Sequence, residues 1–451
     1  MLFNSIEFLI IFLPVILFVY HTVPVRARLL VLCIGSLYFY GRADWVPLLF
    51  LVLSVIWAYG LGILSVRFHR GLVVGLAVTF PLLVLFLFRY LDFALTNIGA
   101  GDSTRDVFYF FLSVSLPAGI SFYSFQVAAY SIDVYDGVDP PERNFIKLLA
   151  FVSFFPQLIA GPIMRYDQMS GQLDHVNAHR SLDVDWAKAF KFVSFGLFGK
   201  VVVADVCAGM VTRFDLATGT SSLDAFLSVL SYSFQIYFDF WAYSVIAIGL
   251  GEMFGLRLVK NFNEPYRALN MRDFWRRWHL TLSSWLRDYF YIRIGGNRRY
   301  YRNILLVFAA VGLWHGAGWN FIIWGLYHGF WVLVYATGKA YWDRLPGWLA
   351  IALTFLIVTL GWPLFYLDIG PYSDVIITIF SFSDLSLHFY DFRHILLLGI
   401  FSAWVFMARE SNWLYNHRLA GILDSPVLHA GMVFVAMMFV NWSKTFIYFR
   451  F

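Results

Sequence analysis

The feature that most constrains the fold of this chain is a series of long stretches without any Lys, Arg, Asp or Glu. They occupy residues 46–66, 71–88, 345–367, 395–408 and 426–442. A helix needs roughly 20 predominantly apolar residues to span a bilayer, so several stretches cross alone and the shorter ones must tilt or lean on neighbours. Only 14% of all residues are charged, compared with about 25% in ordinary soluble domains. The sequence predicts an all-α polytopic membrane protein with about 11 or 12 membrane segments.

The charges between these stretches indicate the orientation. Arg26, Arg28, Arg67 and Arg70 fall in alternate loops, while the loop at residues 99–104 is nearly free of cations. Because cytoplasmic loops collect Lys and Arg, the amino terminus is predicted to lie outside. The net charge of +5 is spread along the loops of a largely apolar chain, so it does not indicate nucleic-acid binding.

Three regions interrupt the apolar pattern of what we predict to be one domain, residues 1–451. Residues 133–147 form a polar loop, followed at residues 151–166 by FVSFFPQLIAGPIMRY, an apolar run interrupted by prolines and a glycine. Such a run is typical of a re-entrant segment, which is tolerated only where protein or a cavity covers its backbone. The polar residues 166–187 predict a surface loop.

The third region, residues 251–303, is the longest. Residues 257–302 contain eleven Lys or Arg against Glu264, Asp273 and Asp288, and aromatic residues are interspersed among them. A stretch this basic belongs on the cytoplasmic face. Charge alone leaves two interpretations open: an amphipathic helix whose arginines meet anionic lipid, or a mouth that attracts the phosphates of coenzyme A.

A histidine follows inside an apolar segment. Residues 304–338 contain no charged residue and are too long for one span, so a break is predicted at GAGWN, residues 316–320. Counted as helix from Arg302, His315 lies roughly 20 Å from the basic face. An ionisable side chain at such depth is a functional candidate, and a histidine pKa of about 6.5 suits proton transfer. The alternative is a packing histidine bonded to a neighbouring carbonyl.

Other polar residues are weaker candidates. His328 could anchor a helix at the membrane interface, and His279 could cap a helix or contact lipid phosphate. Asp239 is a candidate buried acid, with an interhelical hydrogen bond as the alternative. In a transporter, Asp239 and His315 would form a proton relay, but the repeat-related broken helices of transporters are absent. No two of these residues share ligand spacing on one helix face, so no metal site is predicted.

Two long motifs carry a specific resemblance. FWRRWHLTLSSWLRDYFYIRIGGNRR, residues 274–299, and GLWHGAGWNFIIWGLYHG, residues 312–329, resemble the membrane-bound O-acyltransferase superfamily. They are most similar to the bacterial branch typified by the membrane subunit of alginate O-acetyltransferase. LPAGISFYSFQVAAYSIDVYDG, FFPQLIAGPIMRY, QIYFDFWAYSVIAIGLGEMFG and NFNEPY agree in the same order, so the resemblance covers nearly the whole chain.

The resemblance implies a ring of helices with re-entrant segments around a central tunnel. It places the catalytic histidine at His315 and a second characteristic polar residue at His279. It also favours coenzyme A at the basic mouth, where Arg276, Arg277 and Trp278 would bind acetyl-CoA as a substrate. No cofactor is expected to be permanently bound.

Residues 446–451, FIYFRF, fit a Phe-x-Tyr-Phe-x-Phe pattern of the same branch, which implies that Tyr448 is an acyl relay. The alternative is an aromatic belt at the membrane interface. One departure stands out: FDFWAYSVIAIG has Trp241, Ala242 and Val245 where the branch has Ser, Gly and Asp.

The implied function is transfer of an acetyl group from cytoplasmic acetyl-CoA across the bacterial inner membrane. Tyr448 would pass it to a periplasmic SGNH-type protein, which acetylates an exopolysaccharide such as alginate. Another polymer (cellulose or peptidoglycan) or another acyl group such as D-alanine is an alternative within the class. A transporter, or an assembly subunit without activity, is the alternative from a different class.

Overall fold

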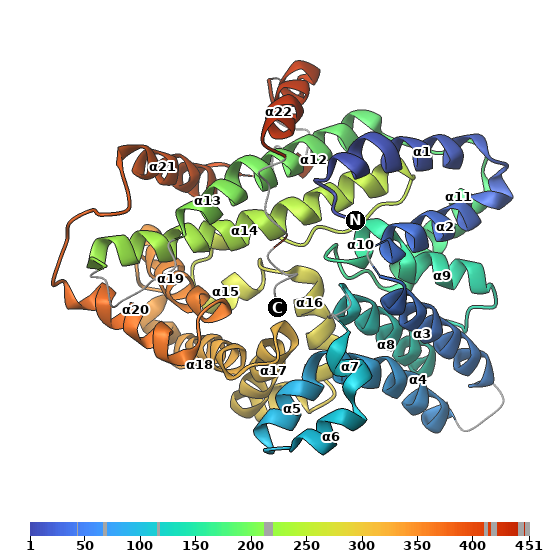
Figure 1. Ribbon diagram of the computed structural model, residues 1–451, viewed down its shortest axis with the longest axis horizontal. Coiled ribbons are helices and arrows are strands. Elements are labelled where there is room, and N and C mark those ends of the chain that lie inside the picture. The colour runs from blue at the N-terminus through green and yellow to red at the C-terminus, as the bar shows by residue number, and fades with distance from the viewer. Residues whose placement is uncertain are drawn as a thin grey trace. The chain divides into compact units, whose positions relative to one another are not determined.

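The computed structural model describes residues 1–42, 44–65, 70–114, 118–211, 220–409, 414, 415, 422–440 and 446 (Figure 1). Within these ranges every regular element is a helix, and none is a strand. The prediction of an all-α protein is confirmed.

Five helical segments among the described residues are long and apolar enough to cross a membrane. They are Trp45–Leu64, Gly71–Asn97, Trp186–Met210, Trp319–Trp342 and Gly347–Phe365. Four shorter apolar helices accompany them, at Glu7–Thr22, Ile369–Ser381, Phe392–Met407 and Pro426–Phe439. The chain is therefore a polytopic membrane protein, as predicted. The count of about 11 or 12 segments, the ring and the tunnel stay predictions.

The chain divides into two compact units. Unit 1 comprises Met1–Val193 and Tyr243–Val259, and unit 2 comprises Ser194–Ala242 and Lys260–Phe451. The helices α12 (Trp186–Phe198) and α14 (Ser222–Met253) contribute residues to both units. That residues 1–451 form one functional domain stays a prediction.

Unit 1 contains most of the first half of the chain. Its helices are η1 (Glu7–Phe12), α1 (Leu13–Thr22), η2 (Val25–Ala27), α2 (Arg28–Gly41), α3 (Trp45–Leu64), α4 (Arg70–Leu85), η3 (Phe86–Tyr90), α5 (Leu91–Asn97), α6 (Asp102–Val107), α7 (Tyr109–Ser113), α8 (Ile120–Asp136), α9 (Phe145–Ser153), α10 (Phe155–Leu158) and α11 (Tyr166–Ala178).

The interrupted run at residues 151–166 is broken as predicted. Helix α9 ends at Ser153, α10 is a single turn, and the chain is then non-helical as far as α11. The break is covered by protein, because Phe155, Pro156 and Gln157 are buried. Gly119, at a φ of +76°, makes room beside it, since a Cβ there would lie 2.5 Å from the carbonyl oxygen of Leu158.

The predicted surface loop at residues 166–187 is wrong for its first half, which forms helix α11. Tyr166, Met169, Leu173 and Val176 are buried, and their spacing of three or four residues places them on one helix face. The guanidinium of Arg28 donates to the carbonyl oxygens that end this helix, 2.8 Å from that of His179. A cation there complements the negative helix terminus.

Unit 2 holds the remaining helices. They are η4 (Gly199–Ala204), α13 (Asp205–Met210), the first part of α14, η6 (Pro265–Arg267), α15 (Met271–Trp275), α16 (Leu280–Leu286), η7 (Arg287–Tyr291), η8 (Gly296–Arg299), α17 (Tyr300–His315), α18 (Trp319–Trp342), α19 (Gly347–Gly361), η9 (Trp362–Phe365), α20 (Ile369–Ser381), α21 (Phe392–Met407), η11 (Ile422–Asp424) and α22 (Pro426–Phe439).

The helices α17 and α18 form a tightly packed hairpin, and the break predicted at residues 316–320 falls between them. Their backbones approach closely because small residues stand at the crossing. A Cβ on Gly312 would lie 2.2 Å from the carbonyl oxygen of Phe321, and a Cβ on Gly325 would lie 2.1 Å from that of Phe308. Glycines at this kind of crossing are typical of membrane helix pairs. The hairpin fixes where His315 lies.

Candidate active site

His315 is the last residue of α17 and is only 2% exposed. Its imidazole packs between aromatic rings, with centroids 5.0 Å from Trp324 and 5.0 Å from Phe365. The next residue is glycine for a steric reason, because a Cβ on Gly316 would lie 2.1 Å from the ring of Phe321. The predicted catalytic histidine therefore lies in a buried, aromatic environment.

His279 immediately precedes α16 and is fully buried. Its Nδ1 lies 3.0 Å from Oδ1 of Asn261, which also accepts a hydrogen bond from the Thr281 hydroxyl at 2.9 Å. Because the amide oxygen only accepts, Nδ1–H of His279 is the donor and the ring lone pair is on Nε2. Burial lowers the pKa of His279 to about 3. The imidazole is therefore neutral at physiological pH. His279 is the N-cap residue of α16, as one interpretation of the sequence had it, but its side chain makes no capping hydrogen bond.

Trp314 links these two histidines, which are 36 residues apart in the sequence. Its ring centroid lies 5.8 Å from that of His279 and 4.8 Å from that of His315. On the other side of His279, the ring of Phe240 lies at 4.7 Å. The structure thus brings together the two histidines predicted to be catalytic. Sequence reasoning missed Asn261 and Trp314 as site residues, although both lie within quoted motifs, NFNEPY and GLWHG.

His328 is fully buried in α18, so its interpretation as an interface anchor is wrong. Its ring lies 4.7 Å from Trp324 and 5.2 Å from Trp275. Trp324 contacts His315 as well, and so it separates the two histidines. His328 therefore belongs to the aromatic packing that supports the site.

The three predicted donor-binding residues have different surroundings. Arg276 is exposed. Arg277 is partly buried, and its Nε lies 2.9 Å from Oδ1 of Asp273. Trp278 is fully buried, with its ring 4.8 Å from that of Trp362 and stacked at 5.6 Å on Phe274. Of the three side chains, only that of Arg276 is exposed.

These contacts also bear on the amphipathic-helix interpretation of the basic region. Residues 271–286 form two short helices, α15 and α16, rather than one surface helix. Phe274 and Trp278 are 0% exposed, so these aromatic side chains contact protein and not lipid. For this segment, the interpretation as a lipid-lying helix is wrong.

Asp239 is buried in an ion-pair cluster. Nζ of Lys200 lies 2.9 Å from Oδ1 of Asp239 and 2.8 Å from Oδ1 of Asp205. Lys200 lies in the π-helical segment η4, and Trp241 packs against that segment, because a Cβ on Gly199 would lie 2.7 Å from the indole. The cluster joins α14 to η4. Val245 is also buried, and nothing in the structure explains its replacement of an acid.

Tyr448 lies outside the described residues, as do all residues of the 446–451 segment except Phe446. Phe446 is 1% exposed, and its ring centroid lies 6.0 Å from that of Phe240. Because Phe240 also contacts His279, the start of this segment lies close to the histidine pair.

No group of three or more His, Cys, Asp or Glu side chains within the described ranges could hold a metal ion. Cys33 and Cys207 are buried free thiols.

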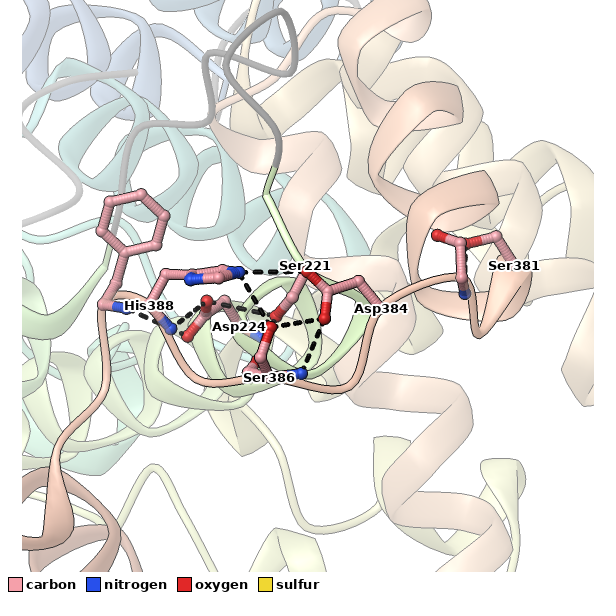
Figure 2. Close-up of polar contacts among 8 residues, drawn as sticks. Ser221, Asp224, Ser381, Asp384, Ser386 and His388 are labelled. Carbon is pink, nitrogen blue, oxygen red and sulfur yellow. Dashed lines mark hydrogen bonds and ion pairs between the residues drawn. The ribbon is translucent and has the colours of Figure 1, made fainter.

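A Ser–His–Asp cluster lies elsewhere in unit 2, in the loop between α20 and α21 (Figure 2). Nε2 of His388 lies 2.9 Å from Oγ of Ser386 and 3.0 Å from Oδ2 of Asp384. A catalytic triad needs the acid on Nδ1 and the nucleophile on Nε2, whereas here one nitrogen faces both. This arrangement therefore cannot act as a hydrolase triad.

The role of this cluster is to hold the loop against the start of α14. The backbone N–H groups of His388 and Phe389 donate to the buried Asp224 carboxylate at 2.8 and 3.3 Å. Hydrogen bonds from Ser386 and His388 lower the pKa of Asp384 to about 2, and Asp384 in turn raises the pKa of His388. The loop is therefore pinned by charge and hydrogen bonding.

Comparison with known proteins adds independent evidence. A model of the membrane-bound O-acyltransferase family matches residues 139–340, which include both histidines. The chain is 41% identical over 383 residues to the probable alginate O-acetylase AlgI of Pseudomonas syringae pv. tomato, covering 81% of this chain and 72% of the relative. It is 38% identical over 416 residues to the peptidoglycan O-acetyltransferase of Helicobacter pylori, covering 81% and 77%.

A more distant relative is named for the transfer of a different acyl group, D-alanyl. The chain is 29% identical over 269 residues to the teichoic acid D-alanyltransferase of Bacillus subtilis, covering 55% of this chain and 68% of the relative. The fold, the buried histidine pair and these similarities agree: the chain belongs to the membrane-bound O-acyltransferase family.

Proposed function

We propose that this protein transfers an acetyl group from cytoplasmic acetyl-CoA across the inner membrane to an extracytoplasmic acceptor. Tyr448 would be the first acceptor, a periplasmic SGNH-type protein the second, and an exopolysaccharide such as alginate the final one. The observation that carries the proposal is the pair of buried histidines, His279 and His315, in contact with the same indole of Trp314.

The surroundings of the pair suit acyl transfer to a hydroxyl. A phenol with a pKa of about 10 needs a base in order to attack at neutral pH, and a neutral imidazole can serve. Burial keeps His279 neutral, and Asn261 holds its lone pair on Nε2. The aromatic rings around His315 exclude water, which would otherwise hydrolyse the acyl group.

His315 accepts the proton of the attacking hydroxyl while the oxygen forms a bond to the acetyl carbonyl carbon. The carbon–sulfur bond of the thioester breaks, and the coenzyme A thiolate leaves and takes up that proton. His279, with its tautomer fixed, presents Nε2 as a hydrogen-bond acceptor that orients the hydroxyl. The resulting aryl ester keeps a good leaving group for transfer to a serine.

The polymer and the acyl group are inferred from the relatives. Two relatives more than 35% identical over 81% of this chain are named as O-acetylating enzymes, while the D-alanyltransferase matches only 55%. This favours acetyl over D-alanyl. A buried carboxylate would suit a transporter's proton relay, but Asp239 is ion-paired with Lys200, which favours the enzyme.

The test is acetyl transfer by the purified protein in lipid nanodiscs, with acetyl-CoA as donor and release of free coenzyme A as the readout. His315→Gln should lower the rate by about 10²–10⁴-fold, the usual contribution of a general base. His179→Gln is the matched control, because His179 is exposed and belongs to unit 1. Near-normal release by His315→Gln would refute the assignment, and no release by the unmodified protein with any acyl-CoA would refute the enzyme.

A further inference from the structure

A groove along the first two apolar helices has no part in the proposed reaction. It lies within unit 1 between η1–α1 and α2 and has a volume of about 430 Å³. The helices run antiparallel: Arg42 pairs with Glu7, the ring of Tyr38 stacks on Phe12, and Gly35 meets Ile16. The groove follows this seam.

The floor of the groove is closed and its walls are aliphatic. A Cβ on Gly35 would lie 2.5 Å from Cδ1 of Ile16, so the helices touch there and leave no passage between them. The walls stand out from the protein, since Ile11, Val15 and Ile34 are 60%, 58% and 60% exposed. Their side chains are branched alkyl groups, which pack well against a saturated chain.

The length of the groove matches one leaflet of a bilayer. Its lining on the first helix runs from Glu7 to Val19, which at the rise of a helix is about 18 Å. Half of a hydrocarbon core about 30 Å thick is about 15 Å. One acyl chain would therefore fill the groove from end to end.

One end of the groove is charged. Nε of Arg42 lies 3.5 Å from Oε1 of Glu7, and the two side chains are 55% and 46% exposed. An exposed ion pair of this kind is weak, so either group can exchange its partner for a ligand. The pair offers a cation and an anion side by side. A headgroup that carries a phosphate and an ammonium would satisfy both, whereas an anionic headgroup without an ammonium would be repelled by Glu7.

We propose that this groove is a binding site for a single phosphatidylethanolamine molecule. One acyl chain lies along α1 and α2, the phosphate binds Arg42, and the ammonium binds Glu7. The groove belongs to unit 1 and the histidine pair to unit 2, and lipid binding does not depend on the proposed acyl transfer.

The test is native mass spectrometry of the full chain in detergent, titrated with dioleoyl phosphatidylethanolamine or dioleoyl phosphatidylglycerol. We expect one tightly bound phosphatidylethanolamine, with an affinity at least about tenfold higher than that for phosphatidylglycerol, because charge-assisted hydrogen bonds discriminate at that level. Equal affinity for the two lipids would overturn the proposal.

Variants test the geometry of the site. Val15→Trp should fill the groove and weaken phosphatidylethanolamine binding at least about tenfold, and Ile34→Trp should do the same from the opposite wall. Leu30→Trp is the control, because Leu30 is 47% exposed on α2 but does not line the groove. Glu7→Gln should remove the preference for phosphatidylethanolamine over phosphatidylglycerol. Arg42→Gln should weaken the binding of both lipids.

Two results would contradict the site. Binding that survives both tryptophan variants would mean that the lipid lies elsewhere. A polypeptide that copurifies with the unmodified protein and is lost in Val15→Trp would assign the groove to a partner helix instead.

Discussion

At the scale of single residues, the site depends on a strained histidine. His279 has a φ of +45°, a left-handed conformation that costs a non-glycine residue of the order of 1–3 kcal/mol. Such strain persists only where the surroundings enforce it. Here Asn261 fixes both the side chain and the backbone, since its Oδ1 accepts from the imidazole and its carbonyl oxygen accepts from the N–H of Leu280 at 2.9 Å.

Asn261 should therefore be a positioning residue for the reaction. Asn261→Ala removes the acceptor for Nδ1–H of His279, so the imidazole can adopt the other tautomer. We expect kcat to fall by about 10²-fold or more, as expected when a catalytic imidazole loses its correct tautomer. Asn261→Asp keeps the acceptor oxygen and should retain much more activity at pH 8.

The pH profile separates this role from a merely structural one. In the unmodified protein burial lowers the pKa of His279 to about 3, so protonation of this imidazole does not limit activity between pH 5 and 8. In Asn261→Asp the added carboxylate favours the imidazolium and raises that pKa. The fall of kcat at acidic pH should then begin at a higher pH than in the unmodified protein. An unchanged profile in Asn261→Asp would contradict a direct contact that matters in catalysis.

At the scale of elements, the buried charges show why α14 and η4 stay together. Lys200 lies between Asp205 and Asp239, with side chains 4%, 8% and 2% exposed. Breaking a buried pair by removing one partner costs more than the pair itself contributes, because the remaining charge stays buried. π-Helical segments like η4 are rare and are often found at functional sites.

Lys200→Met should consequently destabilise the protein by about 3–5 kcal/mol. Thermal unfolding in detergent should show a large fall in the melting temperature. Lys339→Met is the control, since the Lys339–Asp343 pair is on the surface of α18 and its loss should change little. A melting temperature unchanged by Lys200→Met would show that the cluster is solvated and not structural.

The sequence predicted some of these elements and not others, for physical reasons. Uncharged stretches predict apolar helices because lipid tolerates few charges. The break at GAGWN was predictable because the uncharged stretch at residues 304–338 is too long for one membrane span. Helix α11 was missed because its apolar positions are sparse within a polar segment. The different exposures of Arg276, Arg277 and Trp278 were not predictable, because consecutive residues point in different directions and tertiary contacts decide which one is buried. The proximity of His279 and His315 was implied by the family resemblance and not by their spacing.

At the scale of the whole molecule, the proposed donor is a polyanion, and the charges of the basic region would act on it together. Eleven Lys or Arg residues lie between residues 257 and 302, and their summed field would raise the local concentration of coenzyme A phosphates. Individual arginines differ in how far their charge is available to a ligand. The charge of Arg277 is already neutralised by Asp273, while Arg276 is exposed.

Arg276→Ala should therefore raise KM for acetyl-CoA more than Arg277→Ala does, and should leave kcat nearly unchanged. The difference from the unmodified protein should shrink as salt increases, since 0.1–0.15 M salt screens such a field over about 8–10 Å. Arg393→Ala is the control, because Arg393 pairs with Asp391 outside the basic region. A change in protein level alone, with KM unaffected, would mean that Arg276 anchors the protein to lipid.

The proposed path of the acyl group ends at Tyr448, in the segment that begins with Phe446. Phe446 packs on Phe240, whose ring lies 4.7 Å from His279. Tyr448 is two residues from Phe446, and two residues of extended chain span at most about 7 Å. The position of Phe446 therefore allows Tyr448 to approach the histidine pair. Tyr448→Phe removes only the hydroxyl, so the protein should fold normally while transfer to the partner stops.

Mass spectrometry of the segment that contains Tyr448 should detect a base-labile acetyl adduct after incubation with acetyl-CoA. The adduct should be absent from Tyr448→Phe and from His315→Gln, and present in Tyr301→Phe, whose tyrosine is exposed at the start of α17. Phe446→Ala should reduce the adduct without removing the hydroxyl, because the segment loses its contact with Phe240. Full acetylation of the partner by Tyr448→Phe would mean that the acetyl group passes directly to the partner, and residues 446–451 would then serve only as an aromatic anchor.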